Sequence, residues 1–169
     1  HAGKRLPELA RELNQSWIDV MIEELGYGGP QQAHFLMSPD VQAEFMRADH
    51  VSLSTDGGPG IAHPRSAGST VLFLQEQVGP GLPLERAIHK LSGLPAVEVL
   101  GLKDRGVLAP GAKADLLVFS PDALKNRATW SAPHLPPEGF DVIIVNGAIA
   151  MEQGVPAAGR HGRLIRRPQ

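Results

Sequence analysis

The stretch HVSLSTDGGPGIAHPR, residues 50–65, decides the fold class that we predict for this chain. It begins with β-branched and apolar residues, which predict a short buried strand over 50–54. It then enters a glycine-rich turn that can continue neither a strand nor a helix. Catalytic groups of α/β proteins gather where strands end, because the loops there can vary without disturbing the packed sheet. Asp56 is therefore the candidate catalytic residue, and His63 and Arg65 follow in the same loop.

The same residues are also compatible with a purely structural role. Asp-Gly is a common turn dipeptide, in which the carboxylate caps backbone N–H groups and the glycine accepts a positive φ. A histidine that precedes a proline is held extended. Arg65 could be solvated or belong to a structural ion pair. Residues 50–65 by themselves leave both interpretations open.

Helices and strands are predicted to alternate ahead of this stretch. Apolar spacing and capping signals predict helices over 6–13, from Ser16 to about Leu25, and from Pro39 to about Ala48, with a strand over 33–37. The helix that starts at Pro39 is expected to bury Val41, Phe45 and Met46. Alternation of this kind predicts parallel strands joined by crossover helices.

After the stretch, the sequence predicts more helices and then a small β unit. The expected elements are helices over 66–77, 83–92 and 95–100, a strand over 115–119, and a hairpin formed by 141–146 and 148–152. The hairpin is predicted to turn at Asn146-Gly147. Residues 121–140 contain several prolines and little periodicity, so we expect a long surface excursion there.

Composition places the chain among ordinary globular proteins. It has 169 residues, of which 42% are hydrophobic and 20% charged, and a net charge of -2. This charge argues against nucleic acid or an anionic membrane as the default partner. No apolar run approaches the roughly 18 residues that a membrane span needs. The sequence begins at His1, so no targeting segment can be read, and a cytoplasmic location is the expectation.

The sequence does not predict a complete catalytic site. It contains no cysteine, and its seven histidines never lie within four residues of one another. No His-x-His or His-x-x-x-His pair is therefore present, so we do not expect a complete metal site within this chain. Phosphate-loop, dinucleotide and nucleophile-elbow motifs are also missing. What remains is one well-placed acid, Asp56.

Two sets of motifs nevertheless resemble a known family. Residues 101–119, GLKDRGVLAPGAKADLLVF, resemble the signature that leads the barrel of the amidohydrolase superfamily back into its small β domain. The segments STDG at 54–57, HPR at 63–65, PEG at 137–139 and VIIVNG at 142–147 are similar to the C-terminal part of the N-acyl-D-amino-acid deacylases, or D-aminoacylases. The resemblance extends from about Gly3 to Arg166.

The resemblance implies an α/β fold. The family has a TIM-like (β/α)8 barrel and a β-sandwich built from both ends of the chain. Residues 1–102 would be the last βα units of the barrel, and residues 103–169 the C-terminal strands of the sandwich. By this resemblance the earlier barrel strands, with a His-x-His and the other zinc ligands, lie outside this chain. The missing N-terminal portion of the same protein would then be its partner.

The resemblance also implies an activity and a set of site residues. Asp56 matches the catalytic aspartate that closes the final barrel strand, and it is a possible metal ligand. Gly57, His63 and Arg65 match the loop that borders the substrate, a small N-acyl amino acid. In this family zinc activates a water molecule and polarises the amide carbonyl. Asp56 would move the proton from that water to the departing amine, and Arg65 would bind the substrate carboxylate through two hydrogen bonds.

One departure from the family pattern leaves the substrate preference open. After His-Pro-Arg the family usually has an aromatic residue, a glycine and a second arginine, whereas residues 66–72 here read SAGSTVL. The isolated chain is expected to be inactive. Two alternatives remain at this stage: another member of the superfamily, such as a dihydroorotase-like cyclic amidase or a deaminase, and a non-catalytic barrel remnant that serves as an interaction module.

Overall fold

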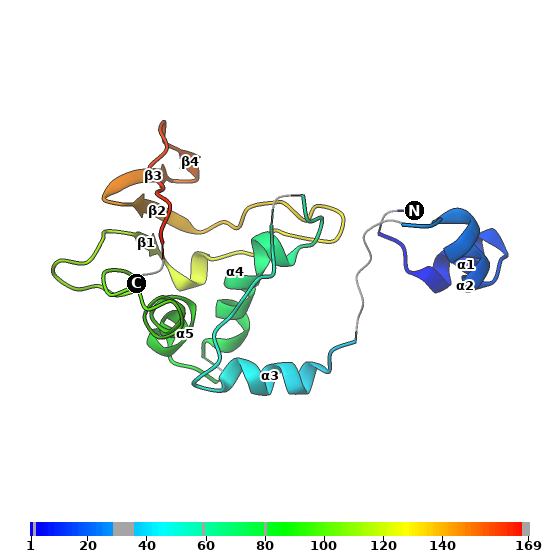
Figure 1. Ribbon diagram of the computed structural model, residues 1–169, viewed down its shortest axis with the longest axis horizontal. Coiled ribbons are helices and arrows are strands. Elements are labelled where there is room, and N and C mark those ends of the chain that lie inside the picture. Colours follow the sequence, from blue (N-terminus) through cyan, green and yellow to red (C-terminus); the bar gives the residue numbers. More distant parts are fainter. Residues whose placement is uncertain (2, 29–35, 59, 80, 167–169) are drawn as a thin grey trace.

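The computed structural model describes residues 1, 3–28, 36–58, 60–79 and 81–166 (Figure 1). The α-helices are α1 (Leu6–Leu13), α2 (Trp17–Asp19), α3 (Pro39–Arg47), α4 (Arg65–Gln77) and α5 (Leu84–Leu91). Shorter helical turns are η1 (Val20–Glu24), η2 (Leu94–Val99) and η3 (Pro121–Ala123). The strands are β1 (Leu116–Phe119), β2 (Phe140–Val145), β3 (Ala148–Glu152) and β4 (Val155–Pro156). Within these described residues, no helix has the length and apolar character to cross a bilayer.

The helices predicted at the start of the chain are confirmed. α1 begins after Arg5, whose backbone N–H donates to the Glu8 carboxylate at 3.0 Å. The second helix is capped by Ser16, whose Oγ accepts a hydrogen bond from the Asp19 N–H at 3.1 Å, and it continues as the π-helical η1. Most of the strand predicted over 33–37 lies outside the described residues. Its last two positions are exposed and not in a strand.

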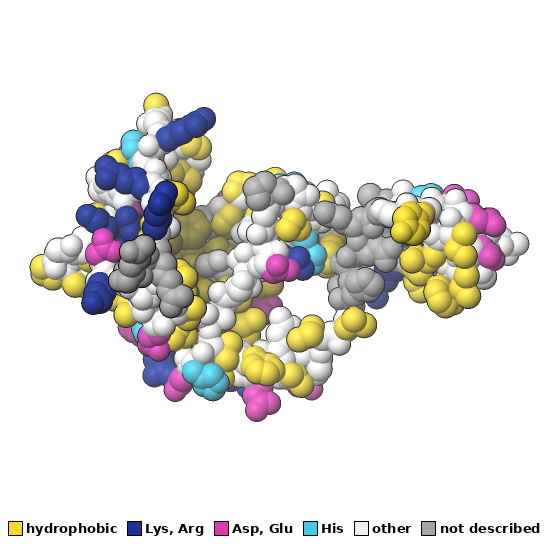
Figure 2. Space-filling model, viewed as in Figure 1, with side chains coloured by type: hydrophobic (Ala, Val, Ile, Leu, Met, Phe, Trp, Pro, Cys, Tyr) yellow, Lys and Arg dark blue, Asp and Glu magenta, His cyan; other side chains and the backbone are white. Residues whose placement is uncertain are grey.

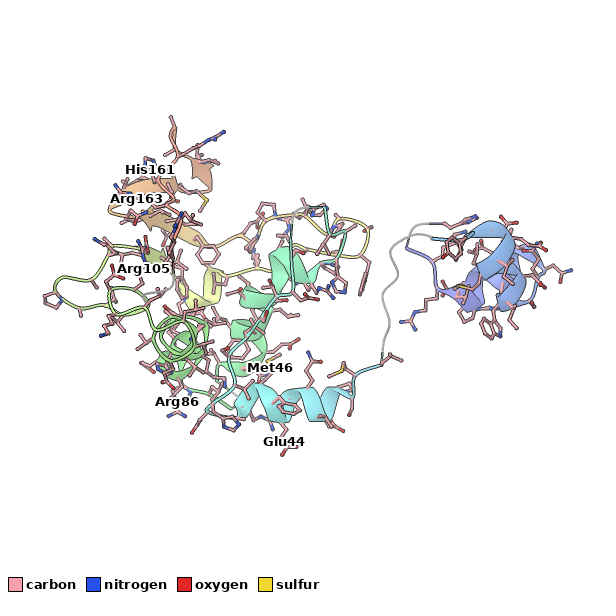
Figure 3. The ribbon with its side chains drawn as sticks, in the orientation of Figure 1. Glu44, Met46, Arg86, Arg105, His161 and Arg163 are labelled. Carbon is pink, nitrogen blue, oxygen red and sulfur yellow. The ribbon has the colours of Figure 1, made fainter. Side chains whose placement is uncertain are left out.

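α3 begins as predicted, but only one of its three predicted core residues packs inward. Pro39 occupies the first turn after Ser38. Met46 packs against the core from the side of α3 that faces α4 (Figure 3). The prediction that Val41 and Phe45 are buried is wrong for this chain, because the described residues place nothing over them and both are exposed. Figure 2 shows apolar surface along this helix.

The core lies between α4, α5 and the loop that follows η3. Its buried members are Val71, Phe73, Leu74, Leu82, Ala87 and Leu124. Leu53, Phe119 and Phe140 pack against this cluster from outside. The core therefore joins the stretch around residue 53 and the β-sheet to the same pair of helices.

The predicted strand over 50–54 is not a strand in this structure. Residues 51–58 have no regular secondary structure, and the described residues place no paired strand beside them. A strand exists through hydrogen bonds to a neighbour, so an isolated extended segment is what these residues form here. The predicted parallel arrangement with crossover helices is accordingly not seen in the described part of the chain.

The C-terminal part folds as an antiparallel sheet with the strand order β1-β2-β3-β4. The predicted hairpin is confirmed: β2 and β3 meet at Asn146 and Gly147, with φ values of 49° and 82°, as in a type I′ turn. The rings of Phe119 and Phe140 stand edge to face at 5.8 Å, on the side where the sheet meets the core.

The signature at 101–119 fixes this hairpin to the preceding loop. Asp115 accepts a hydrogen bond from the Asn146 N–H at 2.7 Å and pairs with Arg105. Arg105 also donates to the Asn146 side chain at 2.9 Å. The Asn146 amide in turn donates to the His161 carbonyl at 2.7 Å (Figure 3). These motif residues thus have a structural role in the β unit.

Candidate active site

Asp56 sits in an unusual backbone conformation at the end of the extended segment. Its φ is 45°, in the left-handed region that few residues other than glycine adopt and that asparagine and aspartate tolerate best. The next residue, Gly57, donates from its N–H to the Thr55 hydroxyl at 3.2 Å. A side chain on Gly57 would lie 2.8 Å from the Ser66 Cα. Glycine at this position thus lets the Asp56 turn approach the first turn of α4.

Arg65, the first residue of α4, holds Asp56 from two directions. One guanidinium nitrogen, Nη2, lies 2.8 Å from the Asp56 Oδ2, and Nε donates to the Asp56 backbone carbonyl at 3.2 Å. The Asp56 side chain is 84% exposed within this chain. Of the roles that the sequence left open for Arg65, the structure shows an ion pair, and it brings together the acid and the cation that the sequence singled out.

His63 is held next to this pair as a neutral imidazole. Its Nδ1 accepts a hydrogen bond from the Arg65 N–H at 3.0 Å, so Nδ1 carries no proton in this geometry. Burial lowers the pKa of His63, and the Arg65 charge lowers it further, against the opposing effect of Asp56. The proton of the neutral ring therefore lies on Nε2, which can act as a hydrogen-bond donor.

Sequence reasoning missed one further residue at this site, Trp130. The Trp130 ring stands edge to face on the His63 imidazole, with 4.6 Å between the ring centroids. Trp130 belongs to the excursion 121–140, which folds back onto α4. Gln75 of α4 donates to the Leu124 carbonyl at 3.1 Å. A lone tryptophan in a proline-rich loop was the available signal, but the sequence did not show which residue it would contact.

A glycine lets this excursion pack closely. A side chain on the buried Gly68 of α4 would lie 2.5 Å from the Asn126 Oδ1. That oxygen already accepts a hydrogen bond from the Ala128 N–H at 3.0 Å.

One further polar atom near Asp56 is buried. The Ser66 Oγ has no hydrogen-bond partner among the described residues.

The two hollows found in the described residues lie away from Asp56. Two hollows of about 460 and 300 Å³ lie around the C-terminal end of α4, and neither is lined by Asp56, His63 or Arg65. Within the described ranges, no group of three His, Asp or Glu side chains could hold a metal ion. This part of the chain therefore does not fit a complete metal site, and Asp56 could be one ligand at most.

Comparison with known proteins gives consistent matches. The model of a family described as "Amidohydrolase family" matches residues 13–151. An N-acyl-D-glutamate deacylase of Alcaligenes xylosoxydans xylosoxydans is 39% identical over 138 residues, which are 79% of this chain and 28% of that protein. A D-aminoacylase of the same organism is 34% identical over 98% of this chain and 34% of its own length.

Solved structures agree. A crystal structure of D-aminoacylase matches with a TM-score of 0.80 and 34% identity, over 98% of this chain and 35% of that one. The N-acyl-D-glutamate deacylase of Bordetella bronchiseptica, solved with zinc and a phosphonate mimic of the tetrahedral intermediate, matches with a TM-score of 0.79 and 31% identity, over 97% and 34%. This chain thus has the mixed helix-and-sheet fold of those structures and spans about a third of the relatives that it matches.

Proposed function

Since this chain belongs to the amidohydrolase family, as its motifs predicted, we propose that it is the C-terminal portion of a zinc-dependent hydrolase that converts N-acyl-D-amino acids to a carboxylate and a free D-amino acid. We call the longer polypeptide the parent protein. In this proposal residues 1–102 belong to its barrel and residues 103–169 to its β-sandwich. The relatives support the substrate class, since those above are deacylases of N-acyl-D-amino acids or a D-aminoacylase.

The observation that carries the proposal is the pairing of Asp56 with Arg65. Together they provide a carboxylate that can move a proton and a guanidinium that can bind a carboxylate, at 2.8 Å from each other. We propose that the substrate carboxylate takes the place of Asp56 on Arg65. The Asp56 carboxylate is then free to accept a proton from the attacking water and to return it to the departing nitrogen.

Gly57 and His63 border the same space in this proposal. Gly57 lets the turn that carries the acid pack against Ser66 at the start of α4, and the Nε2–H of the neutral His63 can donate a hydrogen bond to the substrate. Zinc would be held by ligands outside this segment, with Asp56 as the possible ligand from within it, because the described residues form no metal site of their own.

The direct test is Asp56→Asn in the parent protein. Asparagine tolerates the left-handed backbone, so the variant should fold like the parent. Loss of general acid–base catalysis should lower kcat for N-acetyl-D-amino acids by about a hundredfold or more. Asp141→Asn, at an exposed aspartate of β2, is the matched control and should leave kcat unchanged. Near-normal turnover by a correctly folded Asp56→Asn enzyme would refute the assignment.

A second measurement concerns the isolated segment. Purified residues 1–169 with added zinc should not hydrolyse N-acetyl-D-amino acids, since the proposed zinc ligands lie elsewhere in the parent protein. Turnover by this segment would show that it contains the metal site itself. A panel that includes cyclic amides, tested on the parent protein, separates a deacylase from a dihydroorotase-like amidase.

A further inference from the structure

A buried lysine lies beneath the segment that carries Asp56. Lys90 of α5 is only 3% exposed, and it is the one charged residue in the buried set of the described chain. Its ammonium group donates hydrogen bonds to two backbone carbonyls, those of Ala48 and Val51. A lysine is rarely buried to this degree unless its charge has partners. Here two carbonyls accept from it.

Both carbonyls belong to the turn that joins α3 to the extended segment. Ala48 is the C-cap residue of α3. The Val51 N–H donates a hydrogen bond to the Ala48 carbonyl at 3.2 Å. Val51 begins the segment that passes Leu53, which packs on the core, and ends at Asp56. Lys90 therefore holds the two ends of this turn and stabilises the C-terminal end of α3, where a positive charge is favourable.

A second cation of α5 contacts the same turn from the outside. Arg86, one helical turn before Lys90, pairs with Asp49 (Figure 3). Both partners of this pair are more than half exposed, so solvent and salt screen it. Burial lowers the pKa of Lys90, whereas Asp49 raises it and Arg86 lowers it again. The two cations thus offer a comparison between a buried contact and an exposed one at one place in the fold.

We infer that Lys90 is a positioning residue for the reaction, which sets the path of the segment 51–56 and so the place of the Asp56 carboxylate. The inference rests on the proposed function, because it takes Asp56 to be the proton-transfer group. Lys90 acts here through the backbone carbonyls that it contacts, and it takes no part in the proton transfer. A displacement of a catalytic group by about 1 Å can lower a rate by about a hundredfold.

The test uses substitutions at Lys90 in the zinc-loaded parent protein. Both kcat and KM are measured, and kcat is corrected for the folded fraction that circular dichroism gives. Lys90→Met removes both hydrogen bonds and should lower kcat by about tenfold or more, with KM within about twofold of the parent value. Lys90→Arg keeps a charged donor and should recover most of that loss. Arg86→Met, the matched control, should leave both constants unchanged.

If Lys90→Met does not fold, Lys90→Gln is tested in its place. The glutamine amide can still donate to one of the two carbonyls, so kcat should lie between the parent value and that of an inactive variant. A parent-like kcat in the folded Met or Gln variant would overturn the inference. So would a loss that appears in KM alone. The two proposals fail separately: parent-like turnover by Asp56→Asn overturns the proposed function, whereas parent-like turnover by Lys90→Met, with Asp56→Asn inactive, overturns only this inference.

Discussion

His63 shows how one side chain links the loop at Asp56 to the rest of the chain. Its Nδ1 accepts from the Arg65 N–H at 3.0 Å, and its ring contacts Trp130. Protonation of Nδ1 would replace that hydrogen bond by a repulsive contact between two donors. Burial and the Arg65 charge both disfavour the imidazolium, so the pKa of His63 lies below its ordinary value of 6.5.

We predict a pH dependence of stability from this shift. The unfolded chain binds a proton at His63 near its ordinary pKa, whereas the folded chain binds it only at a lower pH. The unfolded state therefore carries more protons between these two values, and the free energy of unfolding falls as the pH is lowered through that window. NMR titration of the His63 ring, assigned by its absence in His63→Gln, should give a midpoint below 6.5. A midpoint at or above that value would contradict the geometry described here.

At the scale of single elements, the backbone conformation at Gly139 and its close approach to Ala123 explain why the PEG motif ends in glycine. Its φ is +97°, and a side chain there would lie 2.3 Å from the Ala123 carbonyl oxygen. The backbone of the neighbouring Glu138 forms an antiparallel β-bridge with the backbone of Lys125. This pairing restricts any movement of the Gly139 backbone away from Ala123. The glycine thus permits the start of β2 to approach η3 closely.

Gly139→Ala should therefore destabilise the β unit. Backbone strain alone costs on the order of 1–3 kcal/mol, and the collision with Ala123 adds to it. Urea unfolding of the parent protein should show a lower midpoint for the transition that includes β2. Gly162→Ala is the control, because a methyl group added there would meet no atom within 4 Å and its φ is not in the left-handed region. Equal midpoints for the two variants would mean that the backbone adjusts freely at residue 139.

The elements also show which structural features the sequence could predict. α1, α4 and α5, with the Asn146-Gly147 hairpin, were predictable because their signals are local: apolar spacing, capping residues and a turn dipeptide. The lack of a strand at residues 51–54 was not, because a strand depends on hydrogen-bonding partners far along the chain. For the same reason Asp56, His63 and Arg65 could be named from one short stretch, whereas Trp130 and Lys90 could not.

At the scale of the whole molecule, α3 carries apolar residues that no other described part of the chain covers. Phe45 is 57% exposed and Val41 45% exposed, one turn apart on the same helix. Apolar patches of this kind mark surfaces that another element covers. Since the chain spans about a third of its relatives' length, we expect the parent protein to bury this face of α3 with residues outside this chain.

The effect of Phe45→Ser should therefore depend on context. In the isolated segment the substitution removes an exposed ring and should change the free energy of unfolding by less than about 0.5 kcal/mol. In the parent protein it should cost about 3–5 kcal/mol, as for other large-to-small changes in a core. Glu44→Gln, at an exposed polar position of the same helix, should be neutral in both. Chemical denaturation of both proteins measures the difference, and an equally small effect of Phe45→Ser in both would mean that α3 faces solvent in the parent protein as well.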